Sequence, residues 1–198
     1  MSTPVTPRCA ACHTRECRSG QDCWHDADRH RPLYDDPHIA RLHRAASAIE
    51  ARHYCQAPRI REVMLFAAEL GCRRLGLAFC VGLAEEAEVI AKILQQEFDV
   101  VSVCCKVCGL AKDSFGLEQI DPSRDRETMC NPAGQALMLN EAGTELNILC
   151  GLCVGHDAIF SRVSTAPVTT LIAKDRVLAH NPLGAIYSPY LRRQLLRE

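Results

Sequence analysis

The sequence has little that would draw it to nucleic acid or lipid. Its 23 Lys and Arg residues nearly balance 24 Asp and Glu residues, and the formal net charge is −1. It therefore lacks the positive charge that binds phosphate backbones or anionic membranes. Aromatic residues make up only 5% of the chain, which argues against a surface for stacking bases. We expect no nucleic-acid partner.

Long apolar segments and common catalytic motifs are also missing. No apolar run approaches the roughly 20 residues that span a bilayer, and Met1 to Cys12 lacks the apolar centre of a signal peptide. We therefore expect a cytoplasmic protein with no membrane partner. The sequence contains no G-x-x-x-x-G-K-S/T loop, no G-x-G-x-x-G fingerprint and no G-x-S-x-G elbow.

Cysteine, in contrast, is abundant, with 13 residues in a chain of 198. The cytoplasm keeps thiols reduced, so this number does not indicate a disulfide framework. Thiols that meet in a reducing compartment are soft metal ligands, suited to zinc or to an iron–sulfur cluster, and they can also carry out redox chemistry.

Four cysteines lie in residues 1–35, a segment with almost no apolar periodicity. Cys9, Cys12, Cys17 and Cys23 form the pattern C-x2-C-x4-C-x5-C. A bound metal would supply the folding free energy that a segment without a core lacks. The spacing is similar to that of a zinc knuckle and also fits a 4Fe-4S cluster, and it does not choose between them. The alternative is a disordered tail that happens to contain cysteine.

The remainder, residues 36–198, is predicted to form an α/β domain. Two helices are expected over residues 36–71. Short apolar runs then predict strands that alternate with helices, which is typical of a parallel sheet. We predict a four-stranded Rossmann-like or flavodoxin-like sheet, and we expect the tail from Asn181, with Pro182 and Pro189, to wrap the surface. The predicted strands cover residues 75–79, 100–103, 146–149 and 168–173.

Cysteines follow three of these four strands, at the edge where ligands bind in open parallel sheets. Cys130 begins the helix before the third strand, which places it at the opposite edge unless the long 109–129 loop carries it back. We predict one metal ligand from each segment, namely Cys80, Cys105, Cys130 and Cys153, with Cys108 and Cys150 as alternates. The alternative for any single one is a buried cysteine that only fills space.

Charged residues accompany these cysteines. Lys106, Lys174 and Arg176 are candidates to balance a negative cluster or to bind an anionic substrate, and a salt-bridged surface turn is the simpler interpretation. His156 is a candidate ligand or proton donor, or it only begins a helix.

Several segments together resemble a family of uncharacterised proteins, predicted to bind metal, from anaerobic bacteria and archaea. The resemblance implies a small cysteine-rich metal-binding protein, and the anaerobic setting favours iron–sulfur over zinc. It implies no reaction. The segments are Met129–Pro132 with Gln135 and Ala136, Asn147–Asp157, Thr169–Arg176 and His180–Pro182.

Three functions are compatible with the sequence. The first is a 4Fe-4S protein in redox or electron-transfer chemistry, with a redox partner or small molecule as its counterpart. The second is a thiol–disulfide oxidoreductase that uses the C-x-x-C pair of Cys150 and Cys153. The third is a zinc-stabilised interaction or sensor module without catalysis.

Overall fold

The computed structural model describes residues 6–197. By packing, the chain divides into two units, Met1–Arg44 and Ala45–Glu198. The sequence suggested a boundary near residue 35, and the first five positions of that predicted segment lie outside the described residues. Across the described part, no helix is long and apolar enough to cross a membrane.

The first unit consists of short helical segments. The 3-10 helices Cys9–Ala11, Glu16–Ser19 and Arg31–Tyr34 flank α1 (Ala27–His30), and α2 (Pro37–His53) begins in this unit and continues into the second. The Asp36 carboxylate accepts hydrogen bonds from the backbone N–H groups of His38 and Ile39, at 2.8 and 3.0 Å. This contact satisfies two donors at the start of α2.

The second unit is a mixed α/β structure built on four parallel strands, as the alternating pattern predicted. The strands are β1 (Arg74–Phe79), β2 (Asp99–Cys104), β3 (Leu146–Cys150) and β4 (Val168–Ile172), in the spatial order β2-β1-β3-β4. All neighbouring strands pair in parallel. The strand order reverses between β1 and β3, the place where open parallel sheets bind their ligands.

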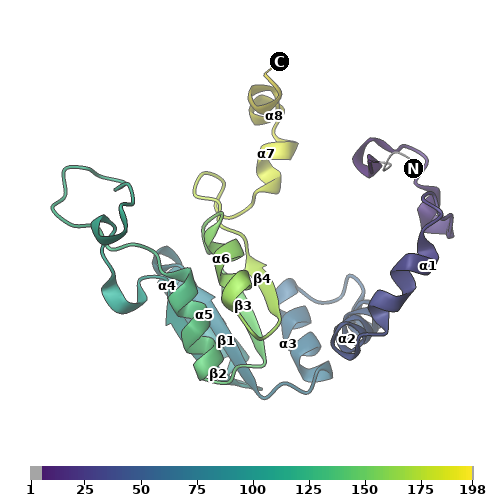
Figure 1. The fold of residues 1–198 in the computed structure, drawn as a ribbon, viewed down its shortest axis with the longest axis horizontal. Coiled ribbons are helices and arrows are strands. Elements are labelled where there is room, and N and C mark those ends of the chain that lie inside the picture. Colours follow the sequence, from purple (N-terminus) through teal and green to yellow (C-terminus); the bar gives the residue numbers. More distant parts are fainter. Residues whose placement is uncertain (1–5, 198) are drawn as a thin grey trace. The chain divides into compact units, whose positions relative to one another are not determined.

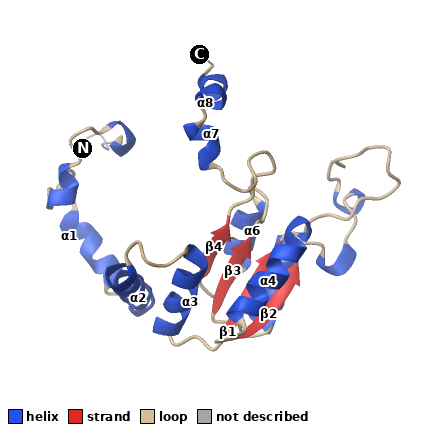
Figure 2. Ribbon diagram, turned by 180° about the vertical axis from the view of Figure 1, so that it is seen from behind, coloured by secondary structure: helices blue, strands red, loops and turns tan. Residues whose placement is uncertain are grey.

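Helices cover both faces of this sheet. In Figure 1, α5 (Pro132–Glu141) and α6 (His156–Val163) lie side by side in front of it. Seen from behind in Figure 2, α3 (Arg59–Glu69) and α4 (Ala84–Leu94) cover the other face. Because it is covered on both faces, every residue of the inner strand β3 is buried.

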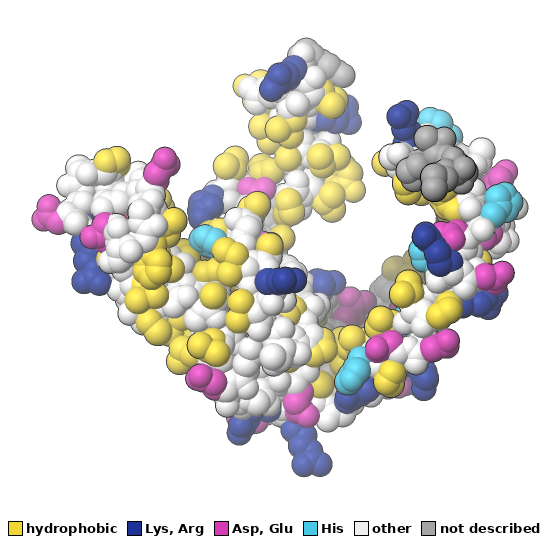
Figure 3. Space-filling view, in the orientation of Figure 1, with side chains coloured by type: hydrophobic (Ala, Val, Ile, Leu, Met, Phe, Trp, Pro, Cys, Tyr) yellow, Lys and Arg dark blue, Asp and Glu magenta, His cyan; other side chains and the backbone are white. Residues whose placement is uncertain are grey.

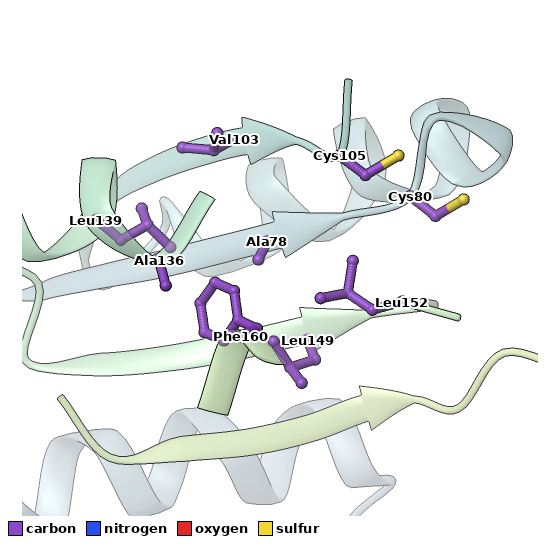
Figure 4. Packing of buried hydrophobic residues seen from close by; sticks show 9 residues of the cluster. All are labelled: Ala78, Cys80, Val103, Cys105, Ala136, Leu139, Leu149, Leu152 and Phe160. Carbon is purple, nitrogen blue, oxygen red and sulfur yellow. The ribbon is translucent and has the colours of Figure 1, made fainter. Parts of the chain in front are cut away.

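The core beside the candidate site lies between the sheet and helices α5 and α6. Nine buried residues form it, and two of them are the strand-end cysteines Cys80 and Cys105 (Figure 4). The others are Ala78, Val103, Ala136, Leu139, Leu149, Leu152 and Phe160. The core therefore extends up to the carboxyl edge of the sheet.

The tail from Asn181 is largely helical, which the sequence did not predict. It forms α7 (Leu183–Tyr187) and α8 (Pro189–Leu196). Pro189 occupies the first turn of α8, and the Ser188 hydroxyl accepts a hydrogen bond from the Leu191 N–H at 3.4 Å. In the space-filling view many apolar side chains of this segment are exposed (Figure 3), namely Leu183, Ile186, Tyr187, Tyr190, Leu195 and Leu196.

Candidate metal centre

Backbone pairing continues past the ends of the strands and holds two cysteines at the sheet edge. The Cys80 N–H donates to the carbonyl of Cys150 at 3.1 Å, and the Cys105 N–H donates to the carbonyl of Phe79 at 2.8 Å. Figure 4 shows both sulfur atoms projecting beyond the ends of β1 and β2. The sheet itself thus positions these two predicted ligands next to each other.

The loop between β2 and α5 carries Cys130 back to this edge. An isolated antiparallel bridge joins Ala111 to Thr128. Next to it, the Lys112 ammonium and the Glu127 carboxylate form an ion pair at 2.9 Å, with both side chains largely shielded from water. The Ala111–Thr128 bridge and this ion pair together close the base of the loop. Apart from the 3-10 helix Asp113–Phe115, the loop beyond them is irregular. Because the base of the loop is closed, the chain leaves the loop close to where it entered, and Cys130 returns to the sheet edge.

Cys105 and Cys130 are therefore in contact. Their Sγ atoms lie 3.9 Å apart, close enough for a hydrogen bond in which either thiol can be the donor. The backbones are joined as well, because the Asn131 N–H donates to the Cys105 carbonyl at 2.8 Å. The side chain of Asn131 also caps α5 by accepting from the Gly134 N–H at 2.8 Å.

The two thiols of this pair have opposite acidities. A hydrogen bond from Cys105 lowers the pKa of Cys130 to about 5, and the electrostatic influence of Lys106 and His156 acts in the same direction. The pKa of Cys105 is raised, because its proton is held by Cys130 and because the side chain is buried. The Val81 N–H donates to the Cys105 sulfur at 3.3 Å. These influences favour Cys130 over Cys105 as the thiolate of the pair.

The turn after β4 brings two cations to two other thiols. Lys174 Nζ lies 3.4 Å from Cys80 Sγ, and an Arg176 guanidinium nitrogen lies 2.9 Å from Cys153 Sγ. Between them, the Asp175 carboxylate accepts from the N–H groups of residues 177 and 178, at 2.9 and 2.8 Å. The turn is thus fixed in the form that presents both cations to the sheet edge.

The remaining predicted cysteines at this edge have different surroundings. Cys150 is fully buried, and burial, together with Glu86 and Cys80, raises its pKa to about 11. Burial also raises the pKa of Cys153, against the opposing influence of Arg176. Cys108 is exposed, on the 3-10 helix Val107–Gly109. The raised pKa of both Cys150 and Cys153 disfavours their thiolate forms.

The sequence assigned no role to Gln135, which the structure places beneath the site. Its side chain is fully buried, and its Nε2 donates to the carbonyls of Phe79 and Val103, at 3.2 and 2.7 Å. Its Oε1 has no partner among the described residues. A polar residue on the apolar face of the predicted helix was the available signal. Gln135 ties α5 to the ends of β1 and β2.

The four amino-terminal cysteines line one cavity of about 500 Å³, together with Trp24 and other side chains. The Cys12 sulfur accepts a hydrogen bond from the Arg15 N–H at 3.4 Å. That bond, and one from Thr14, lowers the pKa of Cys12. The pKa of Cys23 is raised by partial loss of solvent and by the nearby thiols of Cys17 and Cys12. These three cysteines are thus near neighbours.

Among the described residues, neither the sheet-edge cysteines nor the amino-terminal cysteines surround a site of the size of a metal ion. Within residues 6–197, no group of three or more His, Cys, Asp or Glu side chains is arranged closely enough to hold a metal ion. The structure thus brings Cys105 and Cys130 into contact and orders cations beside Cys80 and Cys153, without forming a finished ion site among the described residues.

Comparison with known proteins places the chain in a family. The model of the family described as "Protein of unknown function (DUF1847)" matches residues 19–171. The chain belongs to the DUF1847 family. It is also 44% identical over 190 residues to the "Uncharacterized protein MJ0455" of Methanocaldococcus jannaschii, which covers 96% of this chain and 98% of that protein. No solved structure matches.

The DUF1847 match covers the two groups of cysteines unequally. It includes every predicted ligand at the sheet edge, and of the amino-terminal set it includes Cys23 alone. It ends before Lys174 and Arg176. The alignment with the archaeal relative extends over nearly the whole chain. Membership of DUF1847 therefore bears on the sheet edge more than on the amino-terminal segment.

Proposed function

We propose that the protein binds a 4Fe-4S cluster at the carboxyl edge of its sheet and acts in redox or electron-transfer chemistry. Cys80, Cys105, Cys130 and Cys153 would hold the cluster. The proposal includes a Rossmann-like fold of the flavodoxin-like type, because β2-β1-β3-β4 is the order found in those sheets. It also includes a cytoplasmic location, where thiols remain reduced.

The pairing of thiols with cations is the observation that carries this proposal. Lys174 contacts Cys80, Arg176 contacts Cys153, and Lys106 and His156 favour the thiolate of Cys130. Cysteine ligands bind iron or zinc as thiolates, and a 4Fe-4S cluster with four of them carries net negative charge. Cations at three of the four sulfurs would offset the repulsion among these charges.

The sulfur separations differ between a single ion and a cluster. Four sulfurs around one zinc ion lie about 3.8 Å apart, given a bond length of about 2.3 Å, and the Cys105–Cys130 separation of 3.9 Å matches that value. The cysteine sulfurs of a cluster stand further apart, because a cluster is several ångströms wide. Cys105 and Cys130 would therefore have to move apart to hold a cluster, and the iron and sulfide analysis below decides between the two.

A bound cluster would exchange single electrons with a redox partner or a small molecule. The protein's own residues would set the conditions for that exchange. Buried Cys80 and Cys105 keep water from one side of the site, and Lys174 and Arg176 would raise the reduction potential by favouring added negative charge. For the amino-terminal cysteines we propose a separate metal site, for which zinc is a candidate.

Metal and sulfide analysis of anaerobically purified protein tests the proposal. We expect iron and acid-labile sulfide in equal amounts and a broad absorbance band near ~400 nm. Cys80→Ser and Cys153→Ser should each lose most of the band. Cys55→Ser, which removes an exposed thiol elsewhere, should keep it. A colourless protein with stoichiometric zinc at the sheet edge would refute the cluster and favour the zinc-stabilised module.

A further inference from the structure

Two thiols at the sheet edge are close enough to react with each other. Cys105 Sγ and Cys130 Sγ lie 3.9 Å apart and belong to residues 25 positions apart in the sequence. The hydrogen bond from the Asn131 N–H to the Cys105 carbonyl, at 2.8 Å, keeps the two backbone segments side by side. A disulfide needs its sulfurs at about 2.05 Å. Side-chain rotation can supply most of that approach, because the backbones already meet.

We propose that Cys105 and Cys130 form a reversible intramolecular disulfide, which makes this edge a site of oxidative modification. The disulfide follows from the geometry alone. Its consequence rests on the proposed function: oxidation removes two of the four cluster ligands together, so the oxidised protein cannot load metal at this site. Oxidation and metal binding therefore exclude each other.

The two thiols differ in access, which sets the order of the reaction. Cys105 is only 3% exposed, whereas Cys130 is half-buried. A small disulfide such as glutathione disulfide reaches Cys130 first. The Cys130 sulfur attacks one sulfur of the oxidant, and one glutathione leaves with the proton. Cys105 then attacks the Cys130 sulfur of the mixed disulfide and releases the second glutathione. The protein loses two electrons and two protons, and glutathione disulfide gains them.

The reaction can be followed by mass spectrometry of the full-length, metal-free, reduced protein treated with glutathione disulfide. After digestion we expect a peptide pair that links Cys105 to Cys130 and is lighter by two hydrogen atoms than its reduced halves, whatever the exposed thiols elsewhere form. Cys105→Ser should stop at a glutathione adduct on Cys130, and Cys130→Ser should form no such link. The matched control is Cys104→Ser, which removes the adjacent thiol and should oxidise like the parent. Circular dichroism identifies any variant that does not fold.

Iron loading of the same samples separates this inference from the proposed function. Oxidised protein should take up iron and sulfide at the sheet edge at least about tenfold less than reduced protein, since losing even an outer-shell partner costs that much affinity. Dithiothreitol should restore uptake. A Cys105–Cys130 disulfide without any iron binding would refute the proposed cluster and support the disulfide. Iron binding in a folded protein whose Cys105 and Cys130 stay reduced, or link to other cysteines, overturns the inference.

Discussion

Lys174 Nζ lies 3.4 Å from Cys80 Sγ, although 94 positions separate the two residues in the sequence. Cys80 follows β1 and Lys174 follows β4, and β3 lies between these strands in the sheet. The lysine side chain therefore crosses the end of β3, where it passes Gly151. A Cβ at Gly151 would lie 3.8 Å from Lys174 Cδ. The contact links the last strand of the sheet to the first.

Replacing Lys174 with Met should make the site less favourable for negative charge. A nearby unit charge is worth about 1 kcal/mol when it is well solvated, which corresponds to roughly 40 mV for one electron. We expect Lys174→Met to lower the reduction potential of a bound cluster by about that amount, measured by redox titration with electron paramagnetic resonance. Lys92→Met, at an exposed pair with Glu88, should leave the potential unchanged. Equal potentials in both variants would contradict the role given to Lys174.

Alkylation of Cys130 in the metal-free protein should persist at low pH. Iodoacetamide reacts with thiolates, and a pKa of about 5 keeps Cys130 ionised well below neutrality. The rate should therefore stay high as the pH falls to 6 and decline only near pH 5. Cys150, with its pKa raised to about 11, should not react at neutral pH.

The partner thiol provides the control for this pH profile. Cys105→Ala removes the hydrogen bond to Cys130, so the pKa of Cys130 should rise and its rate at pH 6 should fall by more than about tenfold. Cys105→Ser keeps a donor and should lie between Ala and the parent. If the parent already alkylates with an apparent pKa near that of a free thiol, about 8.5, the hydrogen bond does not act as described.

Gly151→Ala should destabilise the fold more than a glycine replacement elsewhere. Gly151 has φ +66°, and an added Cβ would lie within 1.9 Å of Leu83 Cδ1. Gly143 has nearly the same φ, +67°, with nothing within 4 Å of its Cβ position. Left-handed backbone costs alanine about 1–2 kcal/mol, and overpacking adds about 1–3 kcal/mol. Urea unfolding should show Gly143→Ala losing only the first amount and Gly151→Ala losing both.

Metal removal should unfold the amino-terminal segment alone. No residue from 6 to 39 is buried, so this segment has no apolar core to stabilise it without a ligand. Hydrogen–deuterium exchange should show protected amides around Cys9–Cys23 with zinc or a cluster bound and rapid exchange after chelation. Protection of β1 and β3 should not change. Slow exchange in the chelated segment would mean that its fold does not depend on metal.

The sequence predicted the sheet well because each strand is a short apolar run that ends at a cysteine or a charged residue. It left the position of Cys130 open, because the path of the long loop depends on the Lys112–Glu127 ion pair and the Ala111–Thr128 bridge. Such contacts have no periodic pattern. It did not predict α7 and α8, although Pro182 and Pro189 lie at helix starts, where proline is common.

The cation–thiol contacts at the sheet edge also set an order of events during synthesis. Cys9 to Cys23 lie within a short stretch and leave the ribosome almost together, so this segment can meet a metal early. The sheet edge needs residues from Cys80 through Arg176, about half of the sequence. It cannot assemble until Arg176 has been synthesised, so its thiols lack their cation partners for longer than the amino-terminal thiols lack one another.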